Sequence, residues 1–366
     1  MPAKKIIYHC VTNDLTYDQR LLKKAESLRS EGWECRLVGR HLKDTKKPPG
    51  NYRIRRFKCW FNRGFFFYLE FNIRLFLFLI LRKWHVVESN DADTLLACGL
   101  ASKVRRRILV YDSHEYFTEV PELQGKYIKR WIWHRIQLWF VPDARLAITV
   151  GPKLALRLSH DYHRDFISVR NLPEKKGSHK SDFVKVMIYQ GALNEGRGLE
   201  ELIDATLALD EWQLWIAGGG PLEDELRSRV EDLALGERVT FYGRLEPDEL
   251  HRLTVRAGVG LNLLKGDSLN YYYSLANKFF DYVQAGIPGI SMDFPEYKFL
   301  CEEFDVALLL EDVNTSSLIK AINKLESPTF YQNMKEECRK ASDNWIWESE
   351  KAKLLSAYQS LLEEEE

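Results

Sequence analysis

Short apolar runs alternate with helical patterns along almost the whole chain. Gln213 to Ala217 is a short and mostly apolar run, whereas Leu199 to Leu207 carries apolar residues at helical spacing. Strands that alternate with helices pair in parallel, because each helix returns the chain to the same edge of the sheet. The predicted strands are 6–11, 34–38, 86–88, 108–111, 144–150, 185–189, 213–217, 239–241 and 259–263, and the predicted helices between them are 18–30, 91–100, 199–207, 222–233 and 247–256. The sequence therefore predicts an α/β protein with parallel sheets.

The length of 366 residues suits two domains, and 45% hydrophobic residues are enough for two cores. The stretch 169–182, VRNLPEKKGSHKSD, has the polar composition of a linker. We therefore expect a first Rossmann-like domain over 1–172 and a second over 173–345. A terminal segment, 346–366, follows within a long helix predicted for Asp343 to Leu362.

Charge is divided unevenly between the two halves. Residues 1–170 contain 32 Lys and Arg against 17 Asp and Glu, so the remainder holds 21 bases and 36 acids. A basic half predicts an anionic partner, of which anionic lipid is preferred and nucleic acid is the rival. The six scattered cysteines and the absence of a signal-peptide pattern predict a cytoplasmic protein with reduced thiols and no metal site.

The stretch Tyr272 to Pro288 reads as a helix that begins beneath a phosphate. Ser274 is the expected N-cap and Gly286 the expected stop. Lys278 places a cation in the first turn, where the helix dipole disfavours it, and Asp281 follows one turn later. A lysine beside backbone amides suits a diphosphate, and the acid suits a ribose diol. The alternative is an amphipathic core helix with two solvated charges.

The segment SLANKFFDYVQAGIP resembles the signature helix of the large retaining glycosyltransferase family 4, the group 1 glycosyltransferases. The family's phosphate-facing lysine falls on Lys278, and its ribose-binding glutamate falls on Asp281. Two positions depart from the family pattern: Tyr273 stands where many members carry a glutamate, and Ala276 stands where the family has a proline.

This resemblance implies a GT-B fold, in which two Rossmann-like domains with parallel sheets face each other across a cleft. It also implies that a C-terminal helix crosses back to the first domain. The second domain would bind a nucleotide-sugar, and transfer would proceed with retention at the anomeric carbon. In this family no protein nucleophile is established, and the departing phosphate is thought to help deprotonate the acceptor. No metal and no cofactor are expected.

Glycine-rich turns follow three of the predicted strands in the second half. GALNEGRG, from Gly191, lets backbone approach phosphate, with Arg197 as a phosphate cation, although Ala192 replaces a second base of the family's form. AGGGP does not complete a dinucleotide fingerprint and so indicates close packing near the nucleotide. With the family's base-reading segment, the predicted donor-binding residues are Gly191, Arg197, Gly218, Gly219, Tyr242, Gly243, Arg244, Ser274, Leu275, Asn277, Lys278 and Asp281.

DSHE follows the predicted strand that ends at Tyr111, so His114 lies at a carboxyl end. A lone histidine is more often structural, but YDSHEYFTEVPEL resembles a form in one branch of the family, whose active-site histidine falls on His114. With it, Arg197 and Lys278 are the predicted catalytic residues. Glu115 and Glu119 are candidates to orient His114 or to be solvated. Asn13 and Asp14, on the first strand-to-helix loop, are the predicted acceptor-side residues, with an ordinary helix start as the alternative.

The stretch from Phe65 to Leu81 is apolar but shorter than the about 20 residues of a membrane span, and it contains Glu70 and Arg74. We expect a core helix with an i,i+4 ion pair. Its basic and aromatic flanks, together with Arg105 to Arg107 and Lys129 to Trp131, also suit a helix on an anionic membrane.

The sequence thus predicts a metal-independent, retaining hexosyltransferase that uses a UDP- or GDP-type nucleotide-sugar. Its acceptor is expected to be a lipid-linked saccharide at the inner membrane face, in cell-surface polysaccharide or glycolipid synthesis, and nucleic acid is not expected as a partner. Two alternatives stay open: a nucleotide-sugar epimerase on the same fold, and a non-catalytic homologue that binds sugar nucleotide or membrane.

Overall fold

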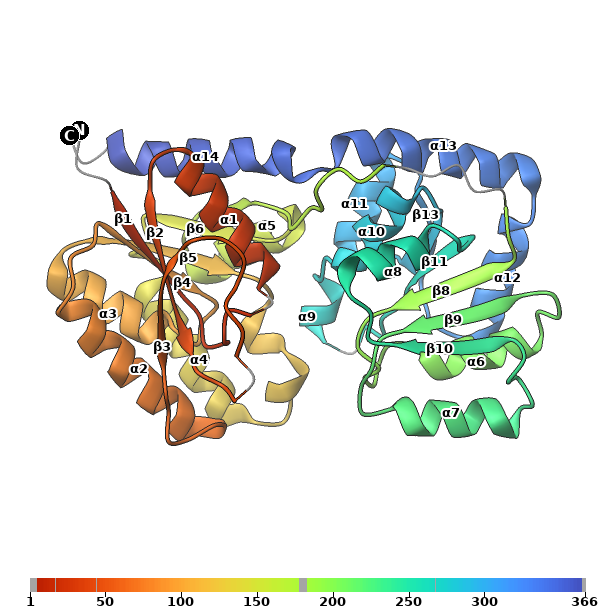
Figure 1. The fold of residues 1–366 in the computed structure, drawn as a ribbon, viewed down its shortest axis with the longest axis horizontal. Coiled ribbons are helices and arrows are strands. Elements are labelled where there is room, and N and C mark those ends of the chain that lie inside the picture. The colour runs from red at the N-terminus through yellow and green to blue at the C-terminus, as the bar shows by residue number, and fades with distance from the viewer. Residues whose placement is uncertain (1–4, 17, 44, 178–182, 267, 364–366) are drawn as a thin grey trace. The chain divides into compact units, whose positions relative to one another are not determined.

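The structure is a computed structural model that describes residues 5–16, 18–43, 45–177, 183–266 and 268–363. Its contacts divide the chain into two compact units: unit 1 comprises Met1–Asn171 and Glu350–Glu366, and unit 2 comprises Leu172–Ser349. Each unit is built around one parallel sheet with helices on its faces (Figure 1).

Unit 1 contains a seven-stranded sheet in the order β3-β2-β1-β4-β5-β6-β7. The strands are β1 (Ile6–Cys10), β2 (Glu34–Arg40), β3 (Arg53–Phe57), β4 (Val86–Asn90), β5 (Ile108–Ser113), β6 (Leu146–Thr149) and β7 (Phe166–Ser168). The helices are α1 (Gln19–Ser30), α2 (Gly64–Ile80), α3 (Leu95–Arg105), α4 (Tyr127–Phe140), α5 (Pro152–Tyr162), the short turns η1 (Phe117–Glu119) and η2 (Pro121–Leu123), and α14 (Trp347–Glu363). Helix α3 packs against both α2 and α4.

Unit 2 repeats the scheme with six parallel strands in the order β10-β9-β8-β11-β12-β13. The strands are β8 (Val186–Gln190), β9 (Gln213–Ala217), β10 (Val239–Gly243), β11 (Val259–Asn262), β12 (Gly289–Met292) and β13 (Ala307–Leu310). The helices are α6 (Leu199–Leu207), α7 (Glu223–Asp232), α8 (Pro247–Thr254), α9 (Leu269–Tyr272), α10 (Asn277–Ala285), α11 (Pro295–Glu303), α12 (Thr315–Leu325) and α13 (Pro328–Asn344). The prediction of α/β units with parallel sheets is confirmed.

The prediction of one helix from Asp343 to Leu362 is wrong. Helix α13 ends at Asn344 and α14 begins at Trp347. Between them Trp345 is almost fully buried and packs its indole against the rings of Phe280 and Phe304. The chain leaves the helical path there because burying a tryptophan ring stabilises more than continuing one helical turn would.

The prediction that Ser274 caps the signature helix is also wrong. Helix α10 starts at Asn277 after the extended residue Ala276, whose backbone N–H donates to the hydroxyl of Tyr297 at 3.0 Å. The helix stops as expected at Gly286, which takes the left-handed conformation (φ 72°) that favours glycine.

Helix α2 fits the predicted core helix only on one face. Phe67, Phe71, Leu75 and Leu79 are buried, and the predicted ion pair between Glu70 and Arg74 forms at 2.7 Å. No helix among the described residues is long and apolar enough to cross a membrane.

Candidate active site

Three glycines at the ends of adjacent strands make a tight floor in unit 2. Gly191 follows β8, Gly218 follows β9 and Gly243 ends β10, and all three have positive φ angles. Backbone bonds join them: Gly218 N donates to Gly243 O at 2.7 Å, and Gly191 N donates to Ala217 O at 2.9 Å. A Cβ atom on Gly218 would lie 1.8 Å from the carbonyl oxygen of Gly191, so no larger residue fits there.

Lys278, in the first turn of α10, extends toward this floor. Its side chain is 8% exposed, and its Nζ has no hydrogen-bond partner among the described residues. The ammonium lies 3.9 Å from the centroid of the Tyr189 ring and 3.8 Å from where a Cβ on Gly191 would be. Burial, and after it the charge of Arg197, holds the pKa of Lys278 well below its usual range.

Arg197 is the second cation of this site. Its guanidinium lies over the ring of Tyr271, 5.3 Å from the centroid, and its Nε has no partner among the described residues. Neither Arg197 nor Lys278 forms an ion pair with a described carboxylate. Two neighbouring cations without an anion are costly unless an anionic ligand neutralises them, so the arrangement suits a diphosphate.

The remaining residues that were predicted to bind the donor lie in the same unit. Asp281, one turn beyond Lys278, accepts a hydrogen bond of 2.9 Å from the side-chain amide of Gln190 at the end of β8. Arg244 lies beside Gly219, with its Nε 3.3 Å from where a Cβ on that glycine would be. Tyr242 is half-exposed and packs its ring against Trp215. Ser274, Leu275 and Asn277 belong to the segment that leads into α10.

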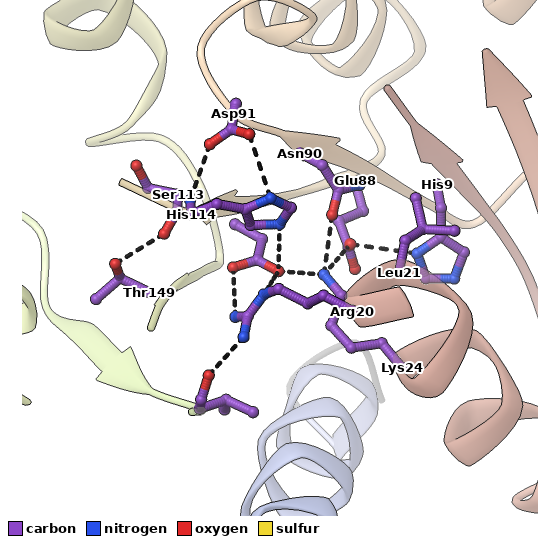
Figure 2. A network of polar contacts seen from close by, with 12 residues as sticks. His9, Arg20, Leu21, Lys24, Glu88, Asn90, Asp91, Ser113, His114 and Thr149 are labelled. Atoms are coloured by element: carbon purple, nitrogen blue, oxygen red, sulfur yellow. Dashed lines mark hydrogen bonds and ion pairs between the residues drawn. The ribbon is translucent and has the colours of Figure 1, made fainter. Parts of the chain in front are cut away.

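In unit 1, His114 lies between two carboxylates (Figure 2). Its Nδ1 is 3.2 Å from Asp91 Oδ2, and its Nε2 is 3.4 Å from Asp112 Oδ2. The backbone N–H of His114 also donates to Asp91 Oδ1 at 2.8 Å. Burial lowers the pKa of His114, but the two carboxylates outweigh it and raise the pKa to about 9. The ring is therefore a cation near neutral pH and can donate hydrogen bonds but cannot act as a base.

Asp91 and Asp112 were not predicted as partners of His114, and Glu119 does not take the orienting role. Glu119 pairs with Arg130 instead. Asp112 could have been considered from the sequence, because it precedes His114 by two residues at the carboxyl end of the same predicted strand. Asp91 could not be found this way, since it sits in a turn with a left-handed backbone (φ 61°).

Behind His114 lies a fully buried ionic network from α1, β4 and β5 (Figure 2). Lys24 Nζ contacts Glu88 at 2.5 Å and also contacts Asp112, while Arg20 binds Asp112 at 2.8 Å. Tyr358 of α14 donates its hydroxyl hydrogen to Glu88. These charges satisfy one another, which fixes Asp112 beneath the imidazole.

The predicted acceptor-side residues build the β1–α1 turn. Asn13 donates to Asp18 at 2.8 Å and accepts from the backbone of Leu15, and Asp14 accepts from the backbone N–H of Thr16 at 3.0 Å. Asn13 and Asp14 lie in the loop before α1, whose N-cap is Asp18, and their acceptor-side role stays a prediction. No cluster of three or more potential metal ligands occurs among the described residues.

Residues 170–345 match the family model of the glycosyl transferases group 1. The chain carries a group 1 glycosyl transferase domain. This domain contains the cations Arg197 and Lys278 and the strand-end glycines, whereas His114 lies outside the matched residues. Among curated proteins, no sequence matches significantly.

Solved structures resemble the whole chain. Sucrose-phosphate synthase from Thermosynechococcus elongatus superposes with a TM-score of 0.80 at 15% identity, covering 98% of this chain and 99% of that one. HepE from Anabaena, in complex with UDP, gives 0.75 at 14% identity, covering 97% and 100%. The lipopolysaccharide outer core galactosyltransferase WaaB, in its apo form, gives 0.70 at 14% identity, covering 97% and 99%. The fold is GT-B, as the resemblance implied.

Proposed function

We propose that this glycosyltransferase moves a hexose-type sugar from a nucleotide-diphosphate donor to a hydroxyl acceptor, with retention and without a metal. The observation that carries the proposal is the buried Lys278 ammonium beside Arg197, which has no hydrogen-bond partner in the part of the chain that the structure describes. A diphosphate would place negative charge beside two cations that form no ion pair with a described carboxylate, and these two cations would take over the neutralising role that a metal ion has in other enzymes. UDP is the first nucleotide to test, because the similar HepE structure holds UDP.

Each donor-side residue has a part in this proposal. The glycines Gly191 and Gly218 would let the backbone approach the diphosphate, and Asp281 would accept hydrogen bonds from the ribose diol. Tyr242 and Arg244, at the end of β10, would contact the base. The segment from Ser274 to Asn277 would bring backbone amides to the phosphates.

Catalysis would then be positioning together with stabilisation of the leaving group. Lys278 and Arg197 would stabilise the charge that develops on the departing diphosphate, and that phosphate would take the acceptor proton. His114, held as a cation by Asp91 and Asp112, would place positive charge against the donor sugar rather than remove a proton.

Unit 1 would bind the acceptor at an anionic membrane. The outward faces of α2 and α4 expose large apolar side chains, including Phe66 (60%), Leu77 (55%), Ile128 (77%) and Trp131 (61%). We call this set, with Phe61 and Leu81, the apolar face of unit 1. Exposed apolar residues beside the cations of the basic half are the composition of an interfacial surface. A lipid-linked saccharide is the acceptor class that this surface suits, in cell-surface polysaccharide or glycolipid synthesis.

Thermal-shift binding of UDP-, GDP-, ADP- and dTDP-sugars in the presence of EDTA tests the donor site. We expect one nucleotide class to stabilise the wild type, by about 2.7 kcal/mol when the ligand is at roughly a hundred times its Kd, and not to stabilise Lys278→Met. Lys320→Met, which alters an exposed lysine on α12, is the matched control and should respond like the wild type. An equal shift in Lys278→Met, or no shift with any donor, would refute the donor site.

A further inference from the structure

Unit 1 contains a cavity of about 610 Å³ that is separate from the donor residues. Its walls come from α2, the start of α3, the segment around η1 and η2, and α4. They are mostly apolar: Leu69, Leu96, Phe117, Ile132 and Trp133 all line it. This volume lies within the roughly 300–1,000 Å³ of ordinary small-molecule sites.

The cavity follows α2 over more than two helical turns. The lining positions run from Gly64 to Asn72, eight residues apart, which corresponds to about 12 Å along the helix axis. At one end the side chain of Asn72 donates to the backbone oxygen of Asp93 at 2.8 Å, so this end adjoins the turn that carries Asp91 and Asp93. At the other end, at Gly64 and Phe65, α2 begins beside the exposed Phe61 and Phe66.

The turn at the Asn72 end offers a hydrogen-bond acceptor that no described residue uses. Asp93 lines the cavity, and although its Oδ2 accepts from the hydroxyl of Thr12, its buried Oδ1 has no partner among the described residues. Burial, reinforced by the charge of Asp91, raises the pKa of Asp93 to about 7. An unsatisfied buried oxygen is costly, and a ligand hydroxyl would satisfy it.

We propose that this cavity binds the acceptor as an amphiphile, with a hydroxyl of its sugar head on Asp93 and its aliphatic chain along α2 toward the apolar face of unit 1. This inference rests on the proposed function and names the acceptor class more closely. The apolar walls suit an alkyl or isoprenoid chain, and they continue into exposed apolar residues at the Phe65 end. Asp91 lines the same cavity and holds His114, so the head would lie near the turn that positions that imidazolium.

A series of alkyl glucosides of increasing chain length, kept below micelle-forming concentrations, tests the proposal by calorimetric titration of the full chain. Each methylene that enters the cavity should lower the Kd about fourfold. Leu69→Trp fills the cavity while keeping an apolar side chain on the surface, so we expect it to abolish this chain-length dependence. Leu156→Trp makes the same change at an exposed leucine of α5 outside the cavity and should retain it.

Asp93→Asn tests the contact with the sugar head separately from the contact with the alkyl chain. It should weaken every glucoside by a similar factor, about five- to tenfold, and leave the dependence on chain length unchanged. It also keeps the test decisive if Leu69→Trp does not fold. The proposal is wrong if the Kd of the wild type does not change with the length of the alkyl chain. It is also wrong if Leu69→Trp folds and its Kd depends on chain length as in the wild type.

Two further measurements distinguish this inference from simple saccharide binding and from the proposed donor site. If glucose alone binds as tightly as the dodecyl glucoside, the cavity takes a saccharide and the proposal is wrong. The nucleotide-sugar panel is run on the same proteins. Donor binding without chain-length dependence refutes the cavity assignment and leaves the proposed function standing, whereas chain-length dependence without donor binding supports the cavity assignment and refutes the donor site.

Discussion

Lys278→Met should make the ligand-free protein more stable while it removes donor binding. Lys278 is buried and its ammonium has no hydrogen-bond partner among the described residues. Leaving such a group unsatisfied costs roughly 1–3 kcal/mol. The contact of the ammonium with the Tyr189 ring offsets part of this, at roughly 0.5–2 kcal/mol. Methionine has a similar length and packs well on an aromatic ring. The expected net gain in the free energy of unfolding is about 1 kcal/mol.

This gain should depend on pH, and the sign follows from the direction of the pKa shift. The pKa of Lys278 is lowered in the folded protein, whereas in the unfolded chain it is about 10.4. Below both values each state holds the proton and the native state bears the full cost of the buried charge. Between these two pKa values the unfolded state holds the proton and the folded state has lost it, so the stability of the wild type increases as pH rises. The advantage of Lys278→Met should therefore be largest at low pH and should shrink as the pH approaches about 10.

Scanning calorimetry without nucleotide measures both quantities. For a unit the size of Leu172–Ser349, about 1 kcal/mol corresponds to a rise in Tm of roughly 2–4 °C. The control Lys320→Met, at an exposed position, should stay within about 0.5 kcal/mol of the wild type. A Lys278→Met protein that is less stable than the wild type, or whose advantage grows with pH, would refute the idea that the lysine is held at a cost for a ligand.

Asp91→Asn should lower the pKa of His114 from about 9 toward its usual value near 6.5, as followed by NMR titration of the imidazole, because asparagine keeps the backbone hydrogen bond but removes the charge. In the wild type this ion pair stabilises the fold below about pH 6.5 and the stabilisation is lost as pH rises through about 9, so the pH dependence should weaken in the variant, while Glu119→Gln should leave the titration unchanged. Trp131→Ser should weaken binding to phosphatidylserine vesicles, measured by sedimentation, about tenfold, since burying a large apolar side chain is worth roughly 1.5–3 kcal/mol. The control Leu156→Ser should bind like the wild type. Vesicle binding that added salt does not weaken would contradict an anionic membrane as the partner.

Periodicity predicted the elements whose sequences carry a clean pattern. Helix α6 and strand β9 have the predicted bounds, because the apolar residues of α6 face one core and those of β9 are buried on both faces of its sheet. Strand β3 (Arg53–Phe57) was not predicted as a strand: it lies at the edge of its sheet, where three arginines in five residues are tolerated and hide the strand pattern. Helix α4 was seen only as part of a basic and aromatic patch, because its apolar residues are largely exposed.

The candidate site residues also divide into those that stand in a local sequence pattern and those that only the fold brings together. Lys278 and Arg197 were found because they stand in a local motif that resembles a family. Asp93 was not found, because its significance depends on a cavity built from segments that lie far apart in sequence. No spacing within one segment encodes such a cavity.

Two buried lysines differ in how the protein balances their charge. Lys24 and Lys278 are both buried side chains on helices that pack against a parallel sheet. Burial lowers the pKa of each, but for Lys24 the carboxylates of Asp112 and Glu88 outweigh burial and raise it, whereas for Lys278 the neighbouring charge is Arg197 and lowers it further. Folding alone therefore supplies the counter-charge of Lys24, and removing that lysine would leave buried carboxylates without their cation. Lys278 has no such counter-charge among the described residues, so the same substitution should stabilise the free protein at Lys278 and destabilise it at Lys24.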